Sequence, residues 1–473
     1  MLLIWPLVTA LIFMRMDRVK ASIWSLLLGY MFLPPSVAID LPVVPGMSKY
    51  EIASVSVALM LWLGMGRKVI ERDQMIADNP PVMPGWIRFL VFVLLTAAVF
   101  TVLTNGDPLA SGITYRPGLQ ISDSVAAALL QAIDLIPFFI GFHLLSTPHQ
   151  SRKLLSALML AVLIYSVPML MEVRLSPQLN VWIYGYFQHD FAQTFRYGGY
   201  RPIVFMTHPI WVASFVTMGF VSALCLARAL GASPRMMLMI AYLALILFIC
   251  KTMTAILMAM LATPLLLLAR PRVILGLSVI IAIGVFSYPL LRLMNFIPTD
   301  YLVEMIGQNQ PERADSMKFR FDNEFILLER AMERPLFGWG AWGRNLPVNP
   351  ETGRYAAIPD GAWVIAFSAR GILGYVAQFG LLISPMIILW RRNFALFRRF
   401  DKSDSLMIVA LALMLAINLI ELIPNATLTP LTWLLNGTVL GHASRLQYSR
   451  VLRQRWLRED SESAAKEGMR PAL

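Results

Sequence analysis

Residues 236–291 read MMLMIAYLALILFICKTMTAILMAMLATPLLLLARPRVILGLSVIIAIGVFSYPLL, and only Lys251, Arg270 and Arg272 bring charge into this stretch. These residues divide it into three apolar blocks. A helix pairs its own backbone groups, so an apolar block of about 17–25 residues can cross the hydrocarbon core of a bilayer. The stretch therefore predicts three consecutive membrane-spanning helices joined by very short turns.

The same pattern extends along the chain, whose 473 residues are 58% hydrophobic and only 14% charged. A soluble domain carries about 25% charged residues. Apolar spans are expected at 2–14, 21–39, 50–66, 86–103, 124–145, 154–171, 203–227, 236–250, 253–269, 273–291, 362–390, 405–424 and 431–444. We therefore expect an all-α polytopic membrane protein with about 12–13 transmembrane helices. The short first span is equally compatible with a half-buried N-terminal helix.

These spans divide the chain into four regions. About ten helices are expected in 1–291 and about three in 362–444. Between them, 292–361 forms a long periplasmic loop, and 445–473 forms a basic cytoplasmic tail. None of these regions is large and polar enough to be a separate soluble enzyme domain.

The net charge of +12 is compatible with nucleic-acid binding, but the placement of the charge argues for membrane topology instead. Basic residues gather in alternate short connections: Arg15, Arg18, Lys20, Arg67, Lys68, Arg72, Arg152, Lys153, Arg228, Arg235, Arg270, Arg272, Arg391, Arg392, Arg398, Arg399 and Lys402. This is the positive-inside pattern. It predicts a bacterial inner membrane protein with a cytoplasmic C-terminus, anionic lipids bound at the basic tail, and no nucleic-acid partner.

Cysteine and histidine usage predicts neither a disulfide framework nor a metal site. Cys225 and Cys250 lie inside apolar spans and are expected to be buried free thiols. His208 has no clustered histidine, cysteine or carboxylate around it in the sequence, so no metal or other cofactor is expected. The segment 1–14 lacks the basic start and cleavage motif of a removable signal peptide.

Two segments on the predicted periplasmic side are too long to be simple turns. One runs from Glu172 to Arg201, and the other is the loop 292–361. Within the loop, Phe321–Met332 is expected to be an amphipathic helix with Phe325, Leu328 and Met332 on one stripe.

Basic residues on this side are the candidates for substrate binding, because positive-inside sorting disfavours them there. Guanidinium groups bind phosphate oxygens bidentately, so Arg201, Arg320 and Lys251 could hold a pyrophosphate and stabilise it as a leaving group. Further candidates are Arg196, Arg344, Arg354 and His208. The alternative for each is an interfacial side chain that snorkels or pairs with a nearby carboxylate.

Asp360 stands where the long loop re-enters the membrane, in the run Ile358-Pro359-Asp360-Gly361. Its carboxylate could orient or deprotonate a sugar hydroxyl, as a general base must. Alternatively it caps the following helix. Trp339, Trp342 and Trp363 could stack on sugar rings, or they could form an interfacial aromatic belt.

Three sequence patches resemble the O-antigen ligase and Wzy-type polymerase superfamily. The first is Arg201 followed by Phe205, Pro209 and Ala213. The second is Arg320 followed by Pro335-Leu336-Phe337-Gly338-Trp339-Gly340, similar to an Arg-containing loop helix that ends in P-x-x-G-x-G. The third is Asp360, Trp363, Gly371 and Gly374, and Lys251-Thr252 stands where a Ser-Arg pair is frequent in the family. The resemblance covers nearly the whole chain.

The resemblance implies a metal-independent glycosyltransferase that uses an undecaprenyl-pyrophosphate-linked glycan at the periplasmic face. Asp360 and Gly361 replace the His-Asn of the family's ligases, and Ala369 stands where Glu is frequent. These departures favour a polymerase of polysaccharide repeat units, with Arg201, Arg320 and Asp360 as catalytic residues. Implied partners include a chain-length regulator and other polysaccharide export proteins. The alternatives are transfer of finished glycan to a lipid or protein acceptor, and a lipid-linked glycan flippase or transporter.

Overall fold

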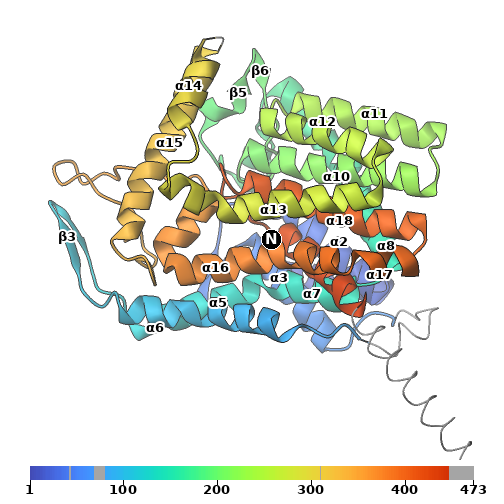
Figure 1. Ribbon diagram of the computed structural model, residues 1–473, viewed down its shortest axis with the longest axis horizontal. Helices are drawn as coiled ribbons and strands as arrows, with labels where there is room; N and C mark the ends of the chain where they lie inside the picture. Colours follow the sequence, from blue (N-terminus) through green and yellow to red (C-terminus); the bar gives the residue numbers. More distant parts are fainter. Residues whose placement is uncertain (42–43, 69–79, 309, 447–473) are drawn as a thin grey trace, which may run out of the picture.

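The computed structural model describes residues 1–41, 44–68, 80–308 and 310–446, and it is 71% helical. Most helices lie roughly side by side along one direction (Figure 1). The helices are α1 (Trp5–Arg15), α2 (Arg18–Phe32), α3 (Lys49–Trp62), α5 (Gly85–Leu103), α6 (Ile121–Asp134), α7 (Ile136–Leu144), α8 (Pro148–Leu175), α9 (Leu179–Tyr184), α10 (Pro209–Leu230), α11 (Pro234–Ile249), α12 (Met253–Leu268), α13 (Pro271–Leu293), α14 (Thr299–Gly307), α15 (Pro311–Met332), α16 (Ala362–Arg391), α17 (Asn393–Arg399) and α18 (Lys402–Glu421). Residues 430–446 are also helical.

Extended structure in the described residues is confined to three short antiparallel hairpins and two isolated β-bridges, Asp17–Arg67 and Val348–Tyr355. The hairpins are β1 (Ile39–Leu41) with β2 (Val44–Met47), β3 (Leu109–Ser111) with β4 (Thr114–Arg116), and β5 (Phe195–Arg196) with β6 (Gly199–Tyr200). Two short 3₁₀ helices, η1 (Leu2–Ile4) and η2 (Phe191–Thr194), complete the elements.

The chain is a polytopic helical membrane protein, as expected. Among the described residues, seven helical stretches are long and apolar enough to cross a bilayer: α5, α6 with α7, α8, α10, α13, α16 and α18. Three shorter apolar helices are 2–15, α11 and α12. Each of the predicted spans coincides with helix over most of its length, including α2, α3 and 430–446. The total of 12–13 crossings stays a prediction.

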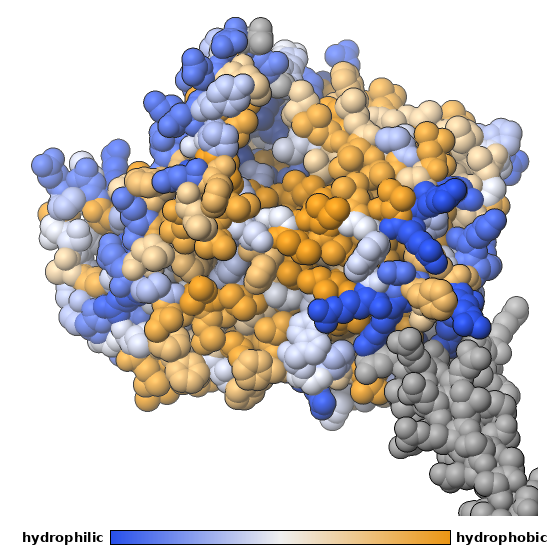
Figure 2. All heavy atoms as spheres, in the orientation of Figure 1, coloured by the Kyte–Doolittle hydropathy of each residue, from blue (hydrophilic) through white to orange (hydrophobic). Residues whose placement is uncertain are grey.

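The surface is divided into bands, as a bilayer requires. In Figure 2 a broad apolar belt separates a polar region over α14, α15 and the β3–β4 hairpin from a polar region at the other end of the bundle. We call the first the loop end and the second, which carries the connections 15–20, 147–153, 230–235 and 391–402, the basic end. Most of the connections at the basic end are those with the predicted positive-inside charge.

The centre of the bundle is formed by α10 and α18, whose most apolar windows are each 83% buried. They contact each other, and α10 also packs against α8 and α12. Close approach of α10 to α8 depends on Gly219, because a Cβ there would lie 2.6 Å from Cγ2 of Val162. Such small residues let membrane helices pack by van der Waals contact where no hydrophobic driving force acts.

Three local expectations were wrong. The span expected at 21–39 ends at Phe32, because Leu33-Pro34-Pro35 breaks the helix. The span expected from residue 203 begins at Pro209, since 201–206 is irregular. In α15 the expected stripe is correct only at Leu328: Phe325 and Met332 are exposed, and the buried residues of this part of the helix are Glu324, Leu327, Leu328 and Ala331.

The long segment between α13 and α16 is tied into α16 itself. Helix α16 is interrupted at Gly371, which has φ 64°. The carbonyls of Ser368 and Ala369 accept from the backbone N–H groups of Trp339 (2.9 Å) and Gly340 (2.8 Å), and the N–H of Ile372 donates to Pro335 (2.7 Å). The segment 335–340 therefore supplies backbone partners that α16 lacks at its own break.

Candidate functional site

The irregular segment 201–206 is held in place by a buried carboxylate. Both oxygens of Glu172, near the end of α8, accept backbone hydrogen bonds: Oε2 from Ile203 (2.8 Å) and Val204 (2.7 Å), and Oε1 from Leu179 (3.2 Å). Glu172 is 1% exposed. These bonds satisfy N–H groups that would otherwise be unpaired before α10 begins, and they fix the position of Arg201.

Arg201 carries a buried guanidinium that is bonded only to neutral acceptors. Its Nη2 donates to Thr252 Oγ1 (2.7 Å), its Nε to the Cys250 carbonyl (3.3 Å), and its Nη1 to the Gln193 carbonyl (3.5 Å). The residue is 1% exposed, and no Asp or Glu forms an ion pair with it among the described residues. Burial, with repulsion from Arg196, lowers the pKa of Arg201 to about 10.

Lys251 joins the turn between α11 and α12 to the β5–β6 hairpin. Its Nζ donates to the carbonyl of Arg196 (2.9 Å) and lies 3.5 Å from that of Tyr197. Gly199 makes this approach possible, because a Cβ there would lie 2.6 Å from the lysine Nζ. The hairpin is therefore folded against the turn, and Lys251 contacts the backbone of Arg196.

His208 lies where the arginine charges converge. Its Nδ1 accepts from the Ile210 N–H (3.0 Å), capping α10, so Nε2 carries the proton and donates to Gln193 Oε1 (3.3 Å). His189 also lies 3.2 Å from that oxygen, with ring centroids 4.5 Å apart. Burial lowers the pKa of His208 to about 3, and the charges of Arg201, Arg196 and Arg320 add to the effect of His189.

Arg320 and Asp360 meet at the edge of this cluster. Nε of Arg320 lies 3.8 Å from Oδ2 of Asp360, and Nη1 donates to the Pro424 carbonyl (3.2 Å). The N-cap residue of α16 is Gly361, and no side chain caps that helix. Asp360 therefore does not cap α16, and its carboxylate instead pairs with Arg320 of α15.

We call Arg196, Arg201, His208, Lys251, Arg320 and Asp360 the arginine site. They come from four separate parts of the chain, and the Arg320–Asp360 pair is linked to the other members through His208, whose pKa the charge of Arg320 lowers. The elements β5, β6 and α15, near which they lie, are on the side of the bundle that carries α14 (Figure 1).

Two predicted binding residues belong to a different cluster. Arg344 is 0% exposed and donates from Nη1 to Pro117 and from Nη2 to Asp107, each to a carbonyl at 2.8 Å. Trp339 is 5% exposed and lies under two guanidinium groups, with Arg330 Cζ 3.4 Å and Arg334 Cζ 4.3 Å from the ring centroid. We call the segment 294–361, between α13 and α16, the outer segment. The Arg344 side chain attaches it to 104–117, whereas the Trp339 ring packs within the outer segment, with its Nε1 donating to the Arg330 carbonyl (2.7 Å).

The remaining aromatic and basic candidates are also placed apart from the arginine site. Trp363 is 0% exposed and packs edge-on against Tyr288, with centroids 5.2 Å apart. Trp342 is 75% exposed on the outer segment, and Arg354 is exposed on a turn. Of the three tryptophans, only Trp342 presents a ring on which a sugar could stack in this arrangement.

Sequence reasoning missed three residues that build the site: Gln193, Thr252 and Glu172. Gln193 bridges His189 and His208, and Thr252 receives the closest bond of Arg201. The sequence contained a signal for Glu172 alone. A carboxylate at the end of an apolar span must find hydrogen-bond donors if it is buried, and here backbone N–H groups provide them.

Within the parts of the chain that the structure describes, no group of three or more His, Cys, Asp or Glu side chains could hold a metal ion. No protein-family model matches the chain, and no curated protein matches it.

Proposed function

We propose that this membrane protein is a periplasmic-face glycosyltransferase of the bacterial inner membrane. It would polymerise undecaprenyl-pyrophosphate-linked oligosaccharide repeat units into a cell-surface or exported polysaccharide. The observation that carries the proposal is Arg201, a buried guanidinium without a carboxylate partner among the described residues, whose pKa is also lowered by the charge of Arg196. A buried charge of this kind is costly unless an anion compensates it.

The donor would place its pyrophosphate against Arg201, Arg320 and Lys251. All three have N–H donors, and phosphate oxygens accept charge-assisted hydrogen bonds from such groups. Lys251 and Arg201 are covered by the β5–β6 hairpin, so this hairpin has to shift for a phosphate to reach them. Fixed cations at this position stabilise charge that develops on the leaving group.

The reaction itself requires one proton acceptor and one leaving group. The acceptor sugar hydroxyl attacks the anomeric carbon of the donor, and a new C–O bond forms. The bond from that carbon to the pyrophosphate breaks, and its electron pair leaves on the phosphate oxygen held by the arginines. The hydroxyl proton passes to the carboxylate of Asp360, which is 39% exposed and can be reached from the loop end.

The test is the fate of lipid-linked glycan in a deletion strain of the native organism, resolved by chain length. Accumulation of single repeat units, with polymer restored by the wild-type gene and not by the Arg201→Gln variant, supports the polymerase. Long polymer stranded on its carrier lipid would instead identify a ligase. Unchanged polymer in the deletion strain would rule out both.

A further inference from the structure

A cavity of 390 Å³ opens at the basic end, between α2 and the start of α8. Its lining includes His149, Arg152 and Lys153 in the first turns of α8. Glu172, which holds the Arg201 segment, is about 30 Å further along the same helix at 1.5 Å per residue. The cavity is therefore at the opposite side of the predicted membrane from the arginine site, and it has no part in the proposed reaction.

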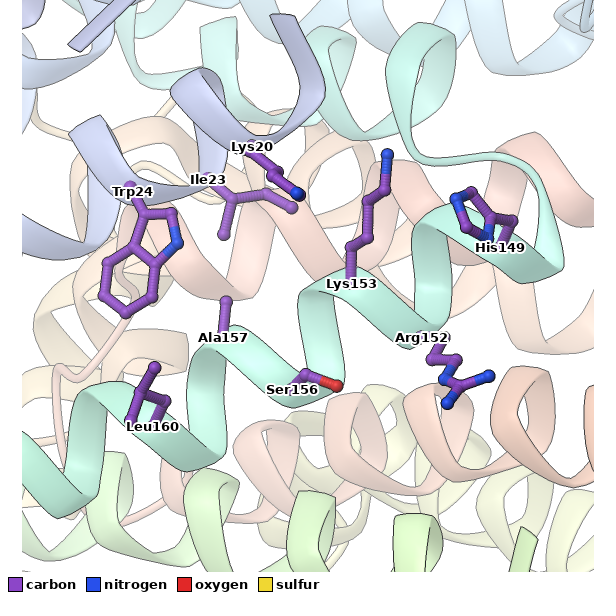
Figure 3. A pocket seen from close by; sticks show the side chains of 9 residues that line it. All are labelled: Lys20, Ile23, Trp24, His149, Arg152, Lys153, Ser156, Ala157 and Leu160. Carbon is purple, nitrogen blue, oxygen red and sulfur yellow. The ribbon is translucent and has the colours of Figure 1, made fainter. Parts of the chain in front are cut away.

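The lining has two chemically distinct sides (Figure 3). On one side, Ile23, Ala157, Leu160 and the indole of Trp24 form an apolar wall. The basic residues begin with Lys20, beside Ile23, and continue through Lys153 to His149 and Arg152 at the other end of the hollow. A second hollow of 500 Å³ shares Lys20 and Trp24 and adds Arg15 and Arg67 to the basic lining.

Among the described residues that line the two hollows, positive charge exceeds negative charge. Asp17 is the one carboxylate among the residues that line the two hollows, which contain five lysines and arginines. It lies 3.7 Å from Lys153 and 3.9 Å from Lys20, and its Oδ1 also accepts the backbone N–H of Lys20. A single carboxylate that two ammonium groups share leaves Arg15, Arg67 and Arg152 without a counter-charge from the lining.

We propose that this cavity binds one anionic phospholipid. The headgroup phosphate contacts Lys20, Arg152 and Lys153, and one acyl chain lies along Ile23 and Leu160. Basic pockets between membrane helices are suited to anionic headgroups, and tryptophan is favoured at the level of the glycerol backbone. A soluble phosphate would satisfy the cations but would leave the apolar wall unused, so the two-sided lining favours a lipid.

The proposed site differs from the predicted lipid contact of the basic tail in the residues that form it, since neither Arg445 nor Leu446 lines the cavity and residues 447–473 lie outside the described part of the chain. It is also independent of the proposed transferase activity, so failure of either proposal leaves the other standing.

The test uses the full-length protein purified in a neutral detergent, with bound lipid counted by native mass spectrometry. Phosphatidylglycerol and phosphatidylcholine with identical acyl chains are compared. The triple variant Lys20→Gln, Arg152→Gln, Lys153→Gln removes the headgroup contacts. The matched control Arg235→Gln, Arg391→Gln, Arg398→Gln removes the same charge from exposed positions at the same end, outside both hollows.

We expect wild-type protein to retain phosphatidylglycerol and not phosphatidylcholine. Because one basic residue near an anionic headgroup changes affinity about fivefold, the triple variant should bind about 100-fold more weakly, with the control within about threefold of wild type. The single variant Arg152→Gln, at an exposed residue, should lose about fivefold and guards against a folding defect in the triple variant.

Three results would overturn the proposal. Equal retention of both lipids would remove the role of charge. Equal loss in the control variant would show general attraction to the basic end. Displacement of the lipid by millimolar inorganic phosphate would identify a soluble anion as the ligand. The variant Leu160→Gln should weaken binding of a dioleoyl lipid and leave a dihexanoyl lipid unaffected, which reports on the apolar wall separately.

Discussion

Nε of Arg320 lies 3.8 Å from Oδ2 of Asp360, so the helix of the outer segment and the start of α16 meet through an ion pair. The side chains are 32% and 39% exposed. A pair this accessible contributes about 0–1 kcal/mol to stability, so little is lost when a ligand separates its members.

The Asp360→Asn variant should keep its fold but no longer support polysaccharide formation. Asparagine keeps the shape of the side chain but cannot accept the hydroxyl proton, and we expect at least about a 100-fold fall in polymer formed. Chain-length analysis of lipid-linked glycan measures this. Glu351→Gln, at an exposed position of the same segment, is the control and should behave as wild type. Normal polymer in Asp360→Asn would remove this residue from the mechanism.

The Arg201→Lys variant tests whether the planar guanidinium is needed rather than the charge alone. Lysine cannot reproduce the three contacts to Gln193, Cys250 and Thr252. We expect a loss of about 10²–10³-fold in transfer rate. Arg354→Lys, at an exposed turn, should stay within about twofold of wild type. Equal effects of the two variants would argue against a specific role for Arg201.

The Arg201→Gln variant should lose activity without losing stability. Removal of a buried charge that lacks an opposite partner should leave the apparent thermal midpoint unchanged or raise it, while activity is lost. Thermal scans in detergent, followed by tryptophan fluorescence, provide the measurement. A fall in the midpoint of several degrees would mean that Arg201 is mainly a structural residue that holds the turn at Cys250.

Stability should fall as the pH is lowered through the range in which unfolded histidine protonates. Unfolded His208 takes up a proton near its ordinary value of 6.5, whereas in the folded protein its pKa is about 3. The unfolded state therefore binds more protons between these values, and stability is lost as the pH falls from about 7 towards 3. His208→Asn keeps a helix-capping oxygen and removes this term. Its midpoint should fall less between pH 7.5 and pH 5 than that of wild type; identical falls would contradict the assignment.

Gly338 should not tolerate a side chain. It has φ 69°, and a Cβ would lie 2.5 Å from backbone atoms of Ala369 and Gly371 in α16. We expect Gly338→Ala to cost about 1–3 kcal/mol and to reduce the yield of folded protein. The control is Gly284→Ala in α13, where nothing lies within 4 Å of the added carbon. A normal yield and midpoint for Gly338→Ala would show that 335–340 packs differently.

Hydropathy alone was sufficient to predict most of each long apolar helix, because an apolar block has to be helical in a membrane. It was not sufficient for the segments between them. The expected stripe of α15 failed because its packing face includes Glu324, which accepts from the hydroxyl of Tyr288 (3.0 Å) and so buries a carboxylate. A pattern based on apolar residues cannot identify a helix face of that kind.

The candidate site was only partly predictable for a related reason. Arg201 and Arg344 look alike in sequence, since both are basic residues on the side that positive-inside sorting disfavours. Their difference lies in distant partners: Nη2 of Arg344 lies 3.9 Å from the carboxylate of Asp107, 237 positions away, whereas Arg201 finds only neutral groups. Nothing local to either residue contains that information.

The break in α16 also has a consequence for biosynthesis. When α16 enters the bilayer, the carbonyls of Ser368 and Ala369 and the N–H of Ile372 have no partners within their own helix, and in hydrocarbon each such group costs several kcal/mol. Their partners in 335–340 precede α16 in the chain and therefore emerge from the ribosome first. Insertion of α16 is therefore complete only when the preceding segment 335–340 packs against its break.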